Sequence, residues 1–72
     1  MTELTYGELF HEFCEWSPEH AFMVIDYRPW GTNSILIWLN NGMAYKVKRT
    51  DTNHFIMQAV SESDIKNHYE LN

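Results

Sequence analysis

One stretch of the sequence decides the fold, and it reads Ile35-Leu36-Ile37-Trp38-Leu39-Asn40-Asn41-Gly42-Met43-Ala44-Tyr45-Lys46-Val47-Lys48. Asn41-Gly42 is a strong hairpin signal, because a type I′ turn needs a positive φ at both of its central residues. A two-residue turn at this pair predicts two antiparallel strands in which Trp38 lies opposite Tyr45. We therefore expect residues 35–39 and 44–48 to form the centre of an antiparallel sheet.

This register gives the hairpin two different faces, because side chains alternate along a strand. The first face is apolar on both strands and is predicted to form the core beneath an N-terminal helix: Leu36, Trp38, Tyr45 and Val47. The second face combines aliphatic side chains with lysines, as an interface with a charged rim does, and is the candidate interaction surface: Ile35, Ile37, Leu39, Lys46 and Lys48. A C-terminal helix could cover this second face instead, and the sequence leaves that choice open.

Helix signals flank the strands at both ends. Thr5 and Glu8 form a capping box that opens a helix ending near Trp16, and Ser61 with Asp64 opens a short C-terminal helix. Strands are predicted over 21–28, 35–39, 44–48 and 54–60, although the last of these could also belong to a helix. The prediction is an α+β domain over residues 1–72, with a three- to four-stranded antiparallel meander, an N-terminal helix on one face and a short C-terminal helix.

Length and composition limit what this chain can be. At 72 residues with 44% hydrophobic side chains, it is expected to fold as one small domain rather than to be disordered. Cys14 is the single cysteine, which excludes an internal disulfide and fits a reducing, cytoplasmic compartment. The longest apolar run, residues 35–39, is too short to span a membrane, and no signal peptide is expected at the N-terminus.

The sequence offers little for catalysis, metals or cofactors. His11 and Cys14 are spaced so that they could share a site on a helix, but no second paired motif supplies further ligands. The neighbouring glutamates would raise the pKa of the Cys14 thiol, which argues against a nucleophile. The glycines are scattered, so no phosphate-binding loop is present. We expect no enzyme activity, no metal and no cofactor.

Charge is uneven along the chain, which carries a net charge of −5. The N-terminal helix bears a candidate acidic face of Glu8, Glu12 and Glu15, through which the protein could imitate nucleic acid as an inhibitor. Basic and aromatic residues instead gather around the predicted sheet, where they could contact nucleic acid: Arg28, Trp30, Lys46, Lys48 and Arg49. The negative net charge opposes binding to phosphate, so nucleic acid is not the expected partner.

The first third of the chain resembles a pattern in short proteins that bacterial phages and mobile elements encode. The residues that carry the resemblance are Leu4-Thr5-Tyr6-Gly7-Glu8-Leu9, Ser17-Pro18-Glu19-His20-Ala21 and Met23-Val24-Ile25. The layout is also similar to that of some small anti-CRISPR inhibitors. The resemblance implies an origin in such an element, and it transfers no functional residue. The expected function is that of a protein-interaction module that binds an unknown protein or a second copy of itself.

Overall fold

The structure is a computed structural model and describes residues 4–70. Its elements follow in the order α1 (Tyr6–Trp16), α2 (Pro18–Met23), β1 (Val24–Gly31), β2 (Ser34–Leu39), β3 (Ala44–Asp51), β4 (His54–Ala59) and α3 (Glu62–Glu70). The predicted α+β layout is therefore confirmed, and residues 54–59 form a strand rather than part of a helix. Helix α2 is new, and it delays the first strand from residue 21 to Val24. Proline disfavours a helix at the residue before it but suits the first helical position, so Pro18 ends one helix and begins another.

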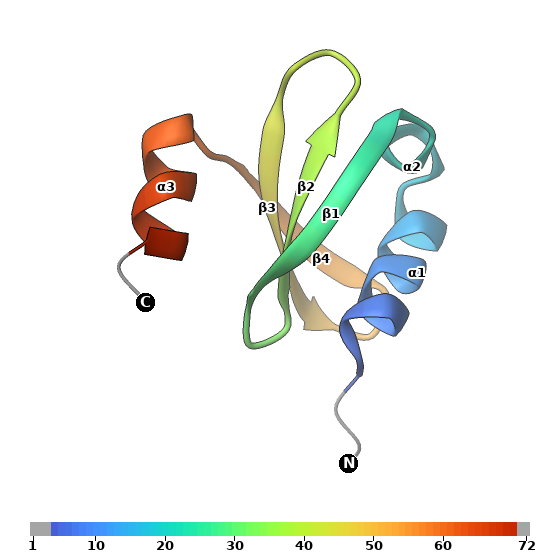
Figure 1. Cartoon of the computed structure of the whole chain (residues 1–72). Helices are drawn as coiled ribbons and strands as arrows, with labels where there is room; N and C mark the ends of the chain where they lie inside the picture. Colours follow the sequence, from blue (N-terminus) through green and yellow to red (C-terminus); the bar gives the residue numbers. More distant parts are fainter. Residues whose placement is uncertain (1–3, 71–72) are drawn as a thin grey trace.

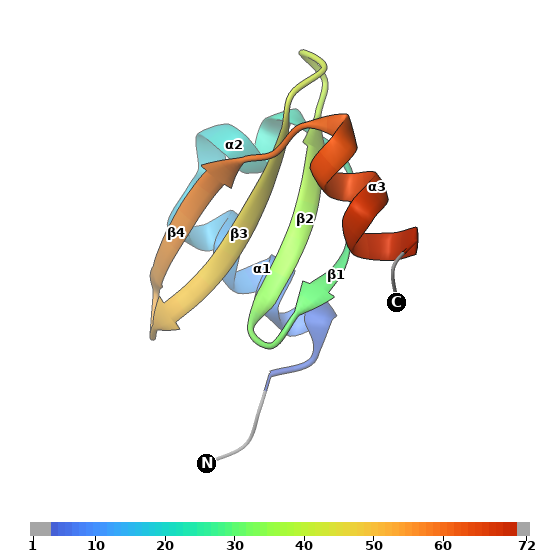
Figure 2. The same ribbon diagram turned by 90° about the vertical axis from the view of Figure 1, so that its left-hand side faces the viewer.

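The four strands form one antiparallel meander in the order β1-β2-β3-β4. Helices α1 and α2 lie on one face of this sheet, and α3 stands on the other (Figures 1 and 2). Strands β1 and β4 are the two edges. The three hairpins each use a residue with positive φ at the end of the loop: Asn33, Gly42 and Asn53. Asparagine and glycine tolerate this conformation best, which explains their positions in the sequence.

The predicted register of the central hairpin is wrong by one residue. Ile37 pairs with Tyr45, and Trp38 pairs with Ala44. The loop holds three residues instead of two, since the Leu39 amide donates to the Met43 carbonyl and the Gly42 amide donates to the Leu39 carbonyl. Gly42 has a φ of 87°, whereas Asn41 does not have a positive φ. This is the turn with a left-handed third residue that commonly closes three-residue hairpin loops.

The changed register exchanges the two faces of β2. Ile35, Ile37 and Leu39 lie in the core with Val47, and all four are buried. They cannot form the exposed interaction surface that the sequence predicted, and Lys46 and Lys48 lie on the opposite face of the sheet. Leu36 and Trp38, predicted to lie beneath the N-terminal helix, are on that opposite face too. A one-residue slip moves every side chain of a strand relative to its neighbour, so a single loop residue accounts for all these differences.

Helix α1 covers the core face with one apolar side. Leu9 and Phe13 are buried, and the Phe10 ring stacks on Tyr27 of β1 with centroids 4.1 Å apart. At the other end of the sheet, Phe13 meets Phe55 of β4 edge to face at 5.9 Å. The capping box of Thr5 and Glu8 starts the helix as predicted. The helix that closes the core is thus the N-terminal one, and α3 does not cover Ile35, Ile37 or Leu39.

Candidate interaction surfaces

The acidic residues of α1 are largely engaged within the protein. The Glu8 carboxylate accepts the Thr5 amide at 3.0 Å, and this hydrogen bond lowers the pKa of the Glu8 carboxyl. Glu15 lies 2.8 Å from His11 on the exposed side of the helix. Glu12 faces the β3–β4 loop. Each residue of the predicted acidic face thus has a partner within the protein, and Glu8 and Glu15 are exposed.

Glu12 and Arg49 form the ion pair that ties α1 to the sheet. Arg49 Nε lies 2.5 Å from Glu12 Oε2, and the Asn53 amide donates to the same oxygen at 3.1 Å. Both side chains are largely shielded from solvent. The hydrogen bond from Arg49 is the main reason that the pKa of the Glu12 carboxyl is lowered. Arg49 therefore lies on the core side and is separated from the other residues of the predicted nucleic-acid surface.

The second face of the sheet carries the other basic residues of the strands. Across the strands, Arg28 of β1 pairs with Leu36 of β2, which pairs in turn with Lys46 of β3. Lys48 follows two residues later on the same face. Trp30 also turns toward this side, where it meets α3. Four of the five residues predicted to contact nucleic acid thus share one face, although Asp26 lies on it as well.

Helix α3 is held against this face by one aromatic cluster. The His68 ring stacks on Trp30 with centroids 3.8 Å apart, and Tyr69 meets Trp30 edge to face at 5.9 Å. The Tyr69 hydroxyl donates to the Pro29 carbonyl at 2.6 Å. Partial burial raises the pKa of the Tyr69 hydroxyl. The C-terminal half of α3 is therefore anchored to the end of β1.

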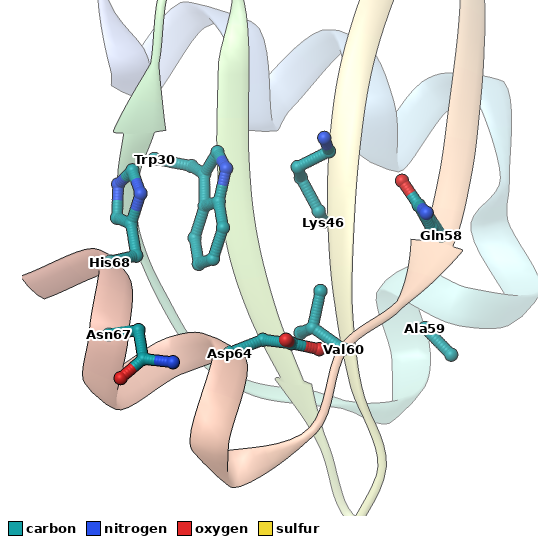
Figure 3. A pocket seen from close by; sticks show the side chains of 8 residues that line it. All are labelled: Trp30, Lys46, Gln58, Ala59, Val60, Asp64, Asn67 and His68. Carbon is teal, nitrogen blue, oxygen red and sulfur yellow. The ribbon is translucent and has the colours of Figure 1, made fainter.

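A groove of about 440 Å³ separates the rest of α3 from the sheet. Figure 3 shows Trp30 and His68 side by side at one end of it, with Lys46 and Gln58 toward the other. Its polar groups are already partly used, because Asp64 accepts the Ser61 amide at 3.1 Å in the cap of α3. One face of the Trp30 indole is covered by His68. The groove offers hydrogen-bond donors, but no nucleophile in it stands beside a base in the way that covalent catalysis requires.

The two edge strands of the sheet differ in the features that prevent pairing with a strand of another chain. Strand β1 carries Asp26, Arg28 and Pro29, and its pairing with β2 is interrupted by two register shifts. Charges, proline and irregular pairing are the devices that keep an edge strand from pairing with another chain. Ile25 of β1 is 68% exposed beside them. The β1 edge is therefore protected.

Strand β4 has none of these devices between Phe55 and Ala59. The segment Phe55-Ile56-Met57-Gln58-Ala59 contains no charged residue and no proline, and its pairing with β3 is regular. Ile56 is 58% exposed on the second face. On the core side, Trp16 lies beside Phe55 with centroids 5.4 Å apart. This edge has the composition of an interior strand.

The backbone groups that β4 directs outward follow from its pairing. The Val60 amide donates to the Ala44 carbonyl, so residues 56 and 58, in the same alternation, bond to β3 as well. The N–H and C=O groups of Phe55, Met57 and Ala59 then point away from the sheet. Within residues 4–70, β4 has a hydrogen-bonded neighbour on one side only. Three residues thus present a free row of donors and acceptors.

The residues considered for metal binding and nucleophilic chemistry do not come together. Cys14 is half-buried beside the core, and burial raises the pKa of its thiol. His11 points to Glu15 instead. Across the described residues 4–70, no three side chains of His, Cys, Asp or Glu are grouped as a metal site requires. Cys14 acts as a small packing residue here.

No family model, no curated protein and no solved structure matches this chain. The resemblance to phage-encoded proteins therefore stays a prediction. Among residues 4–70, none of the helices has the length and apolar character needed to cross a membrane.

The free edge of β4 is the surface that sequence reasoning missed. The signal was present, because residues 52–61 contain no Asp, Glu, Lys or Arg. Whether an uncharged strand indicates a buried position or an open edge depends on the order of the strands in the sheet. The same composition in β2 reflects burial between two neighbours, whereas in β4 it lies at an edge.

Proposed function

We propose that this chain is a non-enzymatic protein-interaction module that binds through the free edge of β4. The observation that carries the proposal is the unprotected row of backbone groups at Phe55, Met57 and Ala59. A strand added there would form main-chain hydrogen bonds, and this strand addition is a common mode of protein recognition. The exposed side chain of Ile56 would supply apolar contact next to them.

Site-directed photo-crosslinking tests this proposal. A photoreactive phenylalanine analogue is placed at position 56 on β4, or at position 25 on β1 as a matched control. Both positions hold exposed isoleucines on edge strands, so the probes have similar access to solvent. In an extract of cells that produce the protein, we expect a discrete protein adduct from position 56 and none from position 25. Equal labelling from the two positions would contradict a binding edge at β4.

Nucleic acid is the second candidate partner, and the shared face of Arg28, Trp30, Lys46 and Lys48 supports it. Two observations weigh against this face as a nucleic-acid site. Helix α3 stands over part of it and uses one face of Trp30, and the net charge is −5. Fluorescence anisotropy with labelled single-stranded DNA and RNA at low salt tests this candidate. Binding that is lost in Lys46→Ala and Lys48→Ala variants, and that weakens steeply with salt, would support it.

A further inference from the structure

We propose that the strand that binds to β4 is β4 of a second copy, paired antiparallel about a two-fold axis at Met57. This inference rests on the proposed function, since it names the occupant of the same edge. Two-fold pairing of one surface with itself is the commonest arrangement of protein dimers. It would join the two four-stranded sheets into one continuous sheet of eight strands.

The backbone of β4 is complementary to itself in this register. With Met57 opposite Met57 of the second copy, Phe55 lies opposite Ala59 of that copy, and Ala59 lies opposite Phe55. These are the three residues whose N–H and C=O groups point outward. Each of the three pairs would then exchange two hydrogen bonds, which satisfies every outward group between residues 55 and 59.

The side chains fit the same register by size. Phe55, the largest residue on the core side of β4, would face Ala59, the smallest. On the second face, Ile56 would lie opposite Gln58 of the second copy, whose aliphatic stem can cover it. Trp16, 39% exposed beside Phe55, would gain a neighbouring sheet on its open side.

Charge also favours a second copy at this edge. Each copy carries a net charge of −5, so two copies repel one another wherever acidic residues meet. Residues 52–61 contain no charged side chain, and Lys48 is the cross-strand neighbour of Ile56. Two copies can therefore approach each other at the β4 edge without bringing charged side chains of one β4 strand against charged side chains of the other.

Sedimentation equilibrium and amide hydrogen exchange on the purified full chain test the pairing. We expect a mass that approaches twice 8.6 kDa as the concentration rises. Over the same range, the amides of Phe55, Met57 and Ala59 should become protected, while those of Ile56 and Gln58 are protected throughout. A chain that stays at 8.6 kDa, with these three amides exchanging freely at all concentrations, would overturn the inference.

Ala59→Pro is the discriminating variant. Proline at this position removes an outward N–H but leaves the hydrogen bonds to β3 intact, as edge positions allow. Two hydrogen bonds are lost per dimer, so the dimer dissociation constant should rise about tenfold or more. Ile56→Glu should also weaken the dimer, whereas Ile25→Glu on the protected edge should leave the mass unchanged. A dimer that Ala59→Pro does not weaken would place the contact elsewhere and overturn the inference.

The crosslinking experiment separates this inference from the proposed function. An adduct at position 56 between two copies supports both. An adduct with a different protein, together with a monomeric purified chain, would contradict the second copy and leave the binding edge in place. If position 56 gives no more adduct than position 25, the binding edge itself is contradicted.

Discussion

The ion pair of Glu12 with Arg49 makes the attachment of α1 to the sheet depend on pH. Its pKa is lowered in the folded protein, chiefly by the hydrogen bond from Arg49. A carboxyl group with a lowered pKa stabilises the fold above its unfolded pKa, and that stabilisation is lost as the pH falls through the folded value. The contribution of Glu12 is therefore complete at neutral pH and declines below the ordinary value of 4.5.

Glu12→Gln should lower the free energy of unfolding by about 1–3 kcal/mol at neutral pH, because it leaves the shielded Arg49 without its charged partner. The difference from wild type should shrink at a pH well below 4.5, because the carboxyl of Glu12 loses its charge as the pH falls through its lowered pKa. Urea unfolding at both pH values measures this. Glu15→Gln is the control, because that side chain is well exposed and its pairing should contribute little. An equal loss at both pH values would show that the charge of Glu12 does not stabilise the fold.

Helix α3 is the element whose stability depends most on a few contacts. A nine-residue helix is not stable alone in water. Its anchor consists of the ring contacts of Trp30 with His68 and Tyr69, together with the hydrogen bond from Tyr69 to Pro29. Aromatic pairs of this kind contribute about 0.5–1.5 kcal/mol each. None of these contacts involves a residue of the core beneath α1.

Trp30→Ala should release α3 while the sheet stays folded. We expect the amides of residues 62–70 to exchange faster and the helical circular dichroism to fall, with the amides of β2 and β3 still protected. Tyr69→Phe, which removes only the hydrogen bond to Pro29, should give a smaller change in the same direction. If the sheet amides lost protection as much as α3 does, Trp30 would be part of the global core instead.

The elements that could be predicted are those whose signals are local. The capping boxes at Thr5 and Ser61 each depend on two residues three positions apart, and both occur as predicted. Helix α2 was not predicted, because a proline such as Pro18 is as typical of the end of one helix as of the start of another. Its second role, as the first residue of a new helix, depends on the residues after it.

At the scale of the whole molecule, the antiparallel meander was predictable and the assignment of its faces was not. Residues 40–42 can close a hairpin as a two-residue or a three-residue loop, and both place Gly42 at a position that favours positive φ. The loop sequence alone does not choose between them, and the side chains of β2 that pack against α1 differ in the two. The observed register places Ile35, Ile37 and Leu39 against that helix. The predicted register would have placed Leu36 and Trp38 there, and the side chain of Trp38 is larger than any of these three. The candidate interaction surface was wrong because the predicted register was wrong by one residue. The edge of β4 could be recognised only once the strand order was known.

The three-residue loop between β2 and β3 also determines where this chain can change in length. Leu39 and Met43 form the last hydrogen-bonded pair before the loop, which holds Asn40, Asn41 and Gly42. Deleting Asn41 would leave Asn40 and Gly42 as a two-residue Asn-Gly turn, with Leu39 still opposite Met43. The deletion variant should therefore fold with the amide protection pattern of β2 and β3 unchanged. Deleting one residue within β2 would instead turn some of the buried aliphatic side chains of β2 away from the core, and that variant should not fold. We therefore expect a single-residue deletion to be tolerated in this loop and not in the strand beside it.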